Sequence, residues 1–154
     1  MIWLIFADVM SENTVFEATV FKISINLSFE PEEKSVMIAY ASTYGNTANA
    51  ADIIACKLFE KGIKTFVYDV SVTPASEIIA TAFRCSHIVL TSATYNNGIF
   101  VNMENLLHDF VAYNIQKRTV GLLQNGTWAS ASGKLMREIL SQCKNVNIIK
   151  ELFR

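Results

Sequence analysis

One stretch of the sequence, residues 42–47, has the composition of an anion-binding turn. It consists of Ser42-Thr43-Tyr44-Gly45-Asn46-Thr47, after an apolar run at 36–40 and before a helical pattern that ends near Lys61. The first N–H groups of a helix have no partner inside it, and the helix dipole adds partial positive charge there. Because the turn holds no lysine or arginine, it favours a phosphomonoester held by neutral donors over a nucleoside triphosphate, whose turn needs a Gly-Lys-Ser/Thr ending.

The same turn has a plainer interpretation, which is an ordinary capped helix start. Asn46 or Thr47 would then be the N-cap, because these side chains accept hydrogen bonds from the first N–H groups of a helix. Both interpretations predict that a helix begins here.

Two further loops carry polar and aromatic residues of a kind that suits a flat ligand. The first runs from Thr94 to Phe100 and contains Tyr95-Asn96-Asn97-Gly98, and the second is 124–128 with Trp128 at its end. Tyrosine and tryptophan offer surfaces for stacking, and asparagine amides offer donors and acceptors to ring carbonyls and nitrogens. The alternatives are loop packing for the aromatic residues and a plain Asn-Gly turn. Neither loop contains a histidine or a pair of carboxylates, so we expect no catalytic acid–base residues.

The elements that must position these loops follow an alternating pattern from residue 35 onward. Apolar runs predict strands, and i, i+3, i+4 spacing of apolar residues predicts helices. The expected strands are 36–41, 64–70, 88–90, 118–123 and 146–149. The expected helices are 46–61, 74–84 with Thr73 as its N-cap, 102–114 and 130–142. This alternation predicts an α/β fold with a doubly wound, five-stranded parallel sheet. Polar, glycine-containing loops follow the first, third and fourth strands. They favour the strand order 2-1-3-4-5, which brings those strand ends together.

Composition limits the classes of protein that the chain can belong to. Its 154 residues suit one domain, and its net charge of −1 argues against nucleic acid or an acidic membrane surface as a partner. No apolar run reaches the roughly 18 residues of a membrane span, and the apolar start lacks the basic leader of a signal peptide. Three unpaired cysteines and two histidines predict a reduced, cytoplasmic protein without a metal site.

Residues 1–34 differ from the rest and are expected to form an N-terminal arm, with the main domain at 35–154. Apolar residues alternate with polar ones from Phe21 to Phe29, which predicts a half-buried strand, and 30–34 is rich in charge, as in a linker. The arm is either an added strand or hairpin on the sheet edge or a remnant of something fused upstream.

From Val36 to about Lys150 the chain resembles a flavodoxin-like domain that binds flavin mononucleotide (FMN), most of all that of flavodiiron proteins (A-type flavoproteins). The resemblance rests on the 42–47 turn, on Thr94-x-Asn96-Asn97-Gly98 followed by Phe100, and on Gly126-Thr127-Trp128. It implies that 42–47 hold the FMN phosphate, that 93–98 follow the edge of the isoalloxazine ring and that 125–128 flank its other side. The implied FMN-binding residues are Ser42, Thr43, Tyr44, Gly45, Asn46, Thr47, Ala93, Thr94, Tyr95, Asn96, Asn97, Gly98, Asn125, Gly126, Thr127 and Trp128.

The resemblance also implies a role in electron transfer. We expect an FMN flavoprotein that passes electrons from a reductase to an acceptor protein, with oxidoreductase activity only together with these partners. The alternatives are a flavin-dependent NAD(P)H quinone or azo reductase, and a flavodoxin-like interaction domain without a cofactor.

Two departures from the family pattern stand out. Two histidines are too few for a diiron centre, so oxygen or nitric-oxide reduction by this chain alone is not expected. The helix expected after the fifth strand is missing, which would leave Ile148, Ile149, Leu152 and Phe153 on an open apolar face. The N-terminal arm or a second copy of the chain, as a homodimer, would cover that face.

Overall fold

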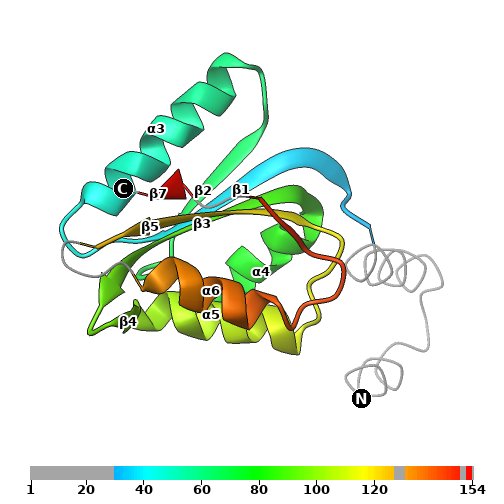
Figure 1. Ribbon diagram of the computed structural model, residues 1–154. Helices are drawn as coiled ribbons and strands as arrows, with labels where there is room; N and C mark the ends of the chain where they lie inside the picture. The colour runs from blue at the N-terminus through cyan, green and yellow to red at the C-terminus, as the bar shows by residue number, and fades with distance from the viewer. Residues whose placement is uncertain (1–29, 127–130, 150–151, 154) are drawn as a thin grey trace.

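A computed structural model describes residues 30–126, 131–149 and 152–153 of the chain (Figure 1). The predicted strand at 21–29, and Thr127 and Trp128 of the candidate site, lie outside these ranges.

A parallel sheet forms the centre of the molecule, and its strand order is the predicted one. The strands β1 (Glu33–Ala41), β2 (Thr65–Asp69), β3 (Cys85–Tyr95), β5 (Thr119–Asn125) and β6 (Asn147–Ile148) lie in the order β2-β1-β3-β5-β6. All four pairings between these neighbours are parallel. Two short strands were not predicted: β4 (Gly98–Ile99) pairs with β3 in antiparallel orientation, and β7 (Leu152–Phe153) pairs with β5 beyond β6.

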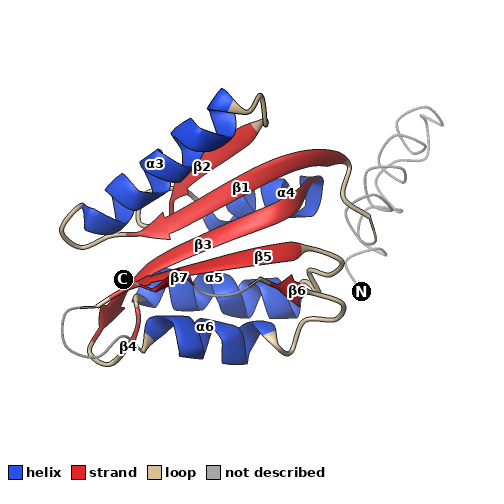
Figure 2. Cartoon of the chain, turned by 45° about the horizontal axis from the view of Figure 1, so that its top comes forward, coloured by secondary structure: helices blue, strands red, loops and turns tan. Residues whose placement is uncertain are grey.

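Helices cover both faces of the sheet, as a doubly wound fold requires (Figures 1 and 2). Helix α3 (Asn46–Glu60) lies on one face, and α4 (Ala75–Arg84), α5 (Val101–Ala112) and α6 (Ser132–Leu140) lie on the other. The larger core lies under the three helices and includes Ile78, Met103, Phe110 and Met136, whereas a smaller core under α3 is built on Val36, Ile38 and Ala51. Every helix in the described ranges is too short or too polar to cross a lipid bilayer.

The boundaries of several elements differ from the predicted ones. Strand β3 extends from Cys85 to Tyr95, well beyond the predicted 88–90, because it is paired on both sides along its length and α4 runs into it without an intervening loop. Helix α4 has Pro74 at the N-cap position, where Thr73 was expected, and no side-chain cap. Helix α6 begins at Ser132 rather than at 130 and ends at Leu140.

The face of the sheet that carries α3 is covered mainly over β1 and β2. Over β3 and β5 it presents the half-buried Val89 and Leu123, and Ile149 is 52 % exposed beside them. Ile148, which was expected on the same open face, instead packs against the larger core on the other side. Of the two residues expected on the open face whose side chains the structure describes, Ile149 is on it and Ile148 is not.

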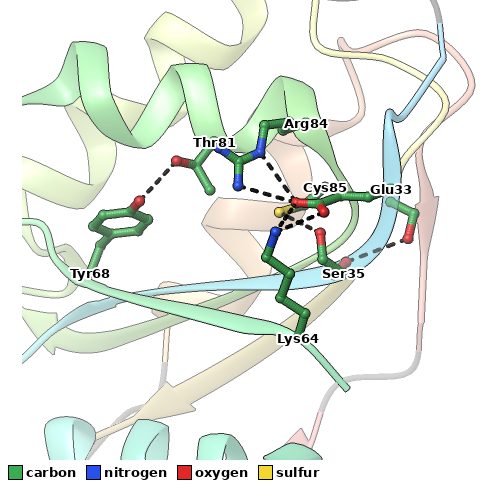
Figure 3. A network of polar contacts seen from close by, with 8 residues as sticks. Glu33, Ser35, Lys64, Tyr68, Thr81, Arg84 and Cys85 are labelled. Carbon is green, nitrogen blue, oxygen red and sulfur yellow. Dashed lines mark hydrogen bonds and ion pairs between the residues drawn. The ribbon is translucent and has the colours of Figure 1, made fainter. Parts of the chain in front are cut away.

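Residues predicted to form a charged linker belong in part to the sheet. Glu33 starts β1, and its carboxylate is bound by Lys64 Nζ at 2.9 and 3.1 Å and by Arg84 Nε and Nη2 at 3.2 Å (Figure 3). Both cations lie over the ring of Phe66, at 5.1 and 4.8 Å from its centroid. This cluster joins β1, the edge strand β2 and the end of α4 at the amino end of the sheet.

We expect the substitution Glu33→Gln to lower the melting temperature at about pH 7 and to have less effect near pH 3. The hydrogen bond from Lys64 is the main cause that holds the pKa of Glu33 below its ordinary value. A lowered carboxylate pKa stabilises the fold above the pKa of the unfolded chain, and this contribution is lost as the pH falls through the folded-state pKa. Since the pair is solvent-accessible, the effect at neutral pH is small. A difference between variant and wild type that stays constant over this pH range would contradict the prediction.

Candidate cofactor site

Three polar loops meet at the carboxyl edge of the sheet. The register of the strands places Ala41, the last residue of β1, beside Ser92 of β3, and Ala93 beside Asn125, the last residue of β5. The turn at 42–47, the β3–β4 hairpin and the segment after β5 therefore start from three adjacent strand ends (Figure 2). The structure thus brings the described parts of all three predicted segments to one edge.

The turn at 42–47 is held by its own residues and not in the way that the sequence suggested. Gly45, and not Asn46 or Thr47, is the N-cap of α3, with a φ of 84° that favours glycine. Its N–H donates to Ser42 Oγ at 3.0 Å, so the hydroxyl fixes the turn. Tyr44 is 90 % exposed, whereas Thr47 on the first turn of the helix is 2 % exposed. The predicted side-chain cap is therefore wrong, because a glycine in the left-handed region starts the helix.

The amino end of α3 is open in the described structure. The first intrahelical bond runs from Asn49 N–H to Gly45 O at 2.9 Å, and no side chain caps the N–H groups before it. The first turn also has no acidic residue. The N–H groups of residues 46–48 and the positive end of the helix dipole are therefore at the edge of the sheet. This arrangement fits an anion such as a phosphate.

The Tyr95–Gly98 segment is a tight β-hairpin turn between β3 and β4. Tyr95 pairs with Gly98, and the two central residues, Asn96 and Asn97, have φ values of 48° and 59°. Positive φ at both central positions is typical of a type I′ turn, and asparagine accepts this conformation better than most residues. Gly98 itself does not need positive φ. The turn projects two amide side chains from the end of β3, and both residues are exposed.

Tyr95 partly follows the packing alternative that the sequence left open. Its ring meets that of Phe100 edge to face, with centroids 6.2 Å apart and an interplanar angle of 65°. It is nevertheless 48 % exposed at the edge of the sheet. The ring of Tyr95 is therefore packed against Phe100 on one side and accessible to solvent or a ligand on another.

The amino end of α6, unlike that of α3, is closed by side chains from two strands. The N–H of Ser132 donates to Thr94 Oγ1 at 3.4 Å, and the N–H of Gly133 donates to Gln124 Oε1 at 2.8 Å. A Cβ at Gly133 would lie 2.8 Å from that same oxygen, so a side chain at this position would displace the Gln124 amide from the start of the helix. Of these two helix ends at the edge, only that of α3 is free of a side-chain cap in the described residues.

The three loop segments at this edge carry no charged side chain in the described residues. No lysine, arginine or histidine occurs in 42–47, 93–98 or 124–126. Tyr40, just before the turn, has a raised pKa, mainly because it is buried and also because Asp69 and Asp52 lie near, so its phenol stays neutral. Among the described residues, no group of three or more His, Cys, Asp or Glu side chains is placed to hold a metal ion.

Sequence reasoning missed Gln124 and Ser132 as structural parts of this edge. Both are buried polar residues; Ser132 bonds to Ser92, 40 residues away, and Gln124 bonds to Gly133, nine residues away, across the loop between β5 and α6. The one signal in the sequence is that α6 follows the end of β5 with an alanine at its N-cap position, which cannot cap it, so its caps must come from other segments. Asn125 and Gly126 lie half-buried at the end of β5, and Thr127 and Trp128 lie outside the described residues.

Comparison with known proteins points to one fold. No protein-family profile matches the chain. The structure is similar to rubredoxin oxygen:oxidoreductase from Desulfovibrio gigas, with a TM-score of 0.73 and 19 % identity over 80 % of this chain and 31 % of that one. It is also similar to a flavodoxin from Fusobacterium nucleatum bound to flavin mononucleotide, with a TM-score of 0.62 and 17 % identity over 76 % of this chain and 70 % of that one.

A sequence relative agrees with the structural neighbours. The diflavin flavoprotein A 2 of Thermosynechococcus vestitus is 26 % identical over 98 residues, which are 64 % of this chain. The chain spans only 17 % of that relative and about a third of the Desulfovibrio protein. Together with the observed strand order, these similarities show that the chain has the flavodoxin-like fold.

Proposed function

We propose that this chain binds FMN at the carboxyl edge of its sheet and transfers electrons between redox partner proteins. The observation that carries the proposal is the open amino end of α3 beside the exposed β3–β4 hairpin. The flavodoxin among the structural neighbours is described as bound to flavin mononucleotide. The relatives named above are longer than this chain, so their whole activities are not carried over to it.

The phosphate of FMN would lie at the amino end of α3. The residues proposed to hold it are Ser42, Thr43, Tyr44, Gly45, Asn46 and Thr47. The N–H groups of the first turn would donate to the phosphate oxygens, and the helix dipole would favour their charge of about −1.5 to −2. Since Gly45 lets the backbone turn within one residue of the helix, the phosphate can approach these donors closely.

The ring of FMN would lie between the hairpin and the segment after β5. The proposed ring-binding residues in the described structure are Ala93, Thr94, Tyr95, Asn96, Asn97, Gly98, Asn125 and Gly126, and Thr127 and Trp128 remain predictions from the sequence. When bound, FMN supplies the capacity to accept and donate one or two electrons. The chain contributes amide groups at Asn96 and Asn97 and no cation in the described loops, so a reduced, anionic ring gains little stabilisation. A low reduction potential, suited to an electron donor, follows from this environment.

The test is to purify the protein, add FMN and record the absorbance spectrum, followed by release of the flavin on denaturation. A bound flavin spectrum supports the proposal, and a folded protein that stays colourless in excess FMN overturns it. Steady-state oxidation of NAD(P)H with a quinone then separates an electron carrier from a reductase. A carrier is inactive in this assay until a reductase is added.

We expect Thr47→Val to weaken the binding of FMN about threefold to tenfold and to leave riboflavin binding unchanged. The substitution keeps the shape of the buried side chain and removes one hydroxyl donor, which is worth about 1 kcal/mol. Riboflavin has the same ring and lacks the phosphate, so the ratio of the two dissociation constants isolates the phosphate contribution. Equal weakening of both ligands would place Thr47 away from the phosphate.

A further inference from the structure

The β3–β4 hairpin is too small to hold its own position. It contains two residue pairs, Thr94 with Ile99 and Tyr95 with Gly98, and a two-stranded ribbon of this size is not stable alone in water. Its turn residues, Asn96 and Asn97, are exposed. Something outside the hairpin must therefore determine where these amides lie.

Part of that support comes from Ile99 of β4, which is buried in the larger core, and part comes from hydrogen bonds to α6. Thr94 Oγ1 donates to Ser132 Oγ at 3.1 Å and accepts from Ser132 N–H at 3.4 Å, and Ser132 Oγ donates to the carbonyl of Ser92 at 3.3 Å. Ser132 is fully buried, and Thr94 is half-buried. The hydroxyl of Thr94 is thus engaged within the protein, two residues before Asn96, and does not point a free donor at a ligand.

The same contacts complete the start of α6, which lacks a local cap. Its N-cap residue, Ala131, has no side-chain oxygen, and Thr94 and Gln124 bind the N–H groups of Ser132 and Gly133 instead. Helix α6 lies against β4, so a shift of the helix start would move the hairpin with it (Figure 1). The position of the hairpin is therefore coupled to that of the helix start.

We propose that Thr94 and Ser132 are positioning residues that hold the β3–β4 hairpin against the start of α6, and that this fixes the place of the Asn96-Asn97 turn beside the flavin ring. The part of this inference that concerns the ring rests on the proposed function. The coupling of the hairpin to α6 does not. Thr94 then acts through Asn96 and Asn97 and not by a side-chain contact with the cofactor.

The experiment compares Thr94→Val with Thr81→Val, a matched control. Thr81 is also a threonine with a buried hydroxyl, bonded to Tyr68 OH at 2.8 Å, but it lies on α4 away from the hairpin (Figure 3). Thr94→Val removes two hydrogen bonds, one to Ser132 Oγ and one from Ser132 N–H, and Thr81→Val removes one, so we expect the loss of stability to be of the same order and somewhat larger in Thr94→Val. If Thr94 contributed to stability alone, both variants would lower the free energy of unfolding and neither would change the affinity for a flavin.

The first measurement is amide hydrogen exchange in the flavin-free protein. We expect β4 and the first turn of α6 to exchange about fivefold faster in Thr94→Val than in Thr81→Val, and Thr94→Ser to restore the slow rates. Equal rates at these amides in the two valine variants would overturn the coupling. This measurement tests the coupling of the hairpin to α6 even if the wild-type protein binds no flavin. Failure to bind flavin would overturn the proposed function and the role of Thr94 toward the ring, but not the coupling.

The second measurement is the affinity for FMN and for riboflavin. We expect Thr94→Val to weaken both about threefold to tenfold and by the same factor, because the ring and not the phosphate loses its support. Thr81→Val should leave both unchanged, and Thr94→Ser should recover the affinity. A loss confined to FMN, or no loss with either ligand, would overturn the assignment of Thr94 as a positioning residue for the ring.

Discussion

Replacing Arg118 by methionine is expected to cost about 3–5 kcal/mol of unfolding free energy, which is the largest stability effect of any substitution considered. Arg118 is 2 % exposed, yet its guanidinium has no carboxylate partner among the described residues. It donates instead to four backbone carbonyls: from Nε to Ala82 at 3.1 Å, from Nη1 to Gln116 at 2.8 Å and Lys117 at 3.4 Å, and from Nη2 to Phe83.

The reason for so large an effect is that two of these carbonyls belong to the last turn of α4. A helix ends with carbonyls that have no partner inside it, and the dipole places partial negative charge there. The guanidinium therefore caps α4 and offsets that charge in a buried place. Burial lowers the pKa of Arg118, but arginine stays charged at any pH at which the protein is folded. Methionine fills a similar volume and leaves the carbonyls without these donors.

Unfolding in urea measures the prediction, with Lys134→Met as the control. Lys134 is a cation as well, but unlike Arg118 it lies on the surface, where its side chain is 81 % exposed. Its Nζ lies 3.9 Å from Oε1 of Glu138 on the same helix. Its removal should change stability by less than about 0.5 kcal/mol. Arg118→Lys should recover only part of the loss, because one ammonium group cannot reach carbonyls on both segments. If Arg118→Met costs no more than Lys134→Met, the cap contributes nothing.

The sequence predicts the strand order because its signals are local and repeated. Apolar runs and helical spacing define each element, and the polar loops after strands show which strand ends must be adjacent. The buried face of α5, with Met103, Leu106, Leu107 and Phe110, follows directly from that spacing. The order β2-β1-β3-β5-β6 can therefore be predicted from the sequence alone.

What the sequence does not predict depends on contacts between distant segments. The start of α6 is displaced from 130 to Ser132 because its caps come from Thr94 and Gln124, which lie on other strands. Glu33 was assigned to a linker because its partners, Lys64 and Arg84, are more than 30 residues away. Arg118 gives no local signal, since its acceptors are carbonyls of a remote helix. In the hairpin, the positive φ angles are those of Asn96 and Asn97, and not of the adjacent glycine.

The sharpest test of the phosphate site is Asn46→Asp, because it should raise stability and weaken cofactor binding at once. Asn46 is the first residue of α3, is exposed and has the same shape as aspartate. A negative charge at a helix amino end stabilises the helix by about 0.3–1 kcal/mol. The same charge would stand next to the proposed phosphate, and repulsion of about 1–3 kcal/mol at this partly exposed place weakens FMN binding about tenfold to a hundredfold. Riboflavin carries no phosphate, so its affinity should stay within about twofold.

Asn145→Asp is the control for the change in net charge. Asn145 is exposed, has a φ of 55° that aspartate also accepts, and lies just before β6, at the amino end of the sheet. This variant should bind FMN and riboflavin as the wild type does, since the charge is far from the carboxyl edge and screened by salt. Titration of flavin fluorescence gives both affinities, and urea unfolding of the flavin-free protein gives the stability. If Asn46→Asp binds FMN as tightly as the control, the phosphate does not lie at α3. If Asn46→Asp weakens the binding of riboflavin as much as that of FMN, the substitution has disturbed the edge as a whole. This outcome would contradict a specific repulsion between the aspartate and the phosphate.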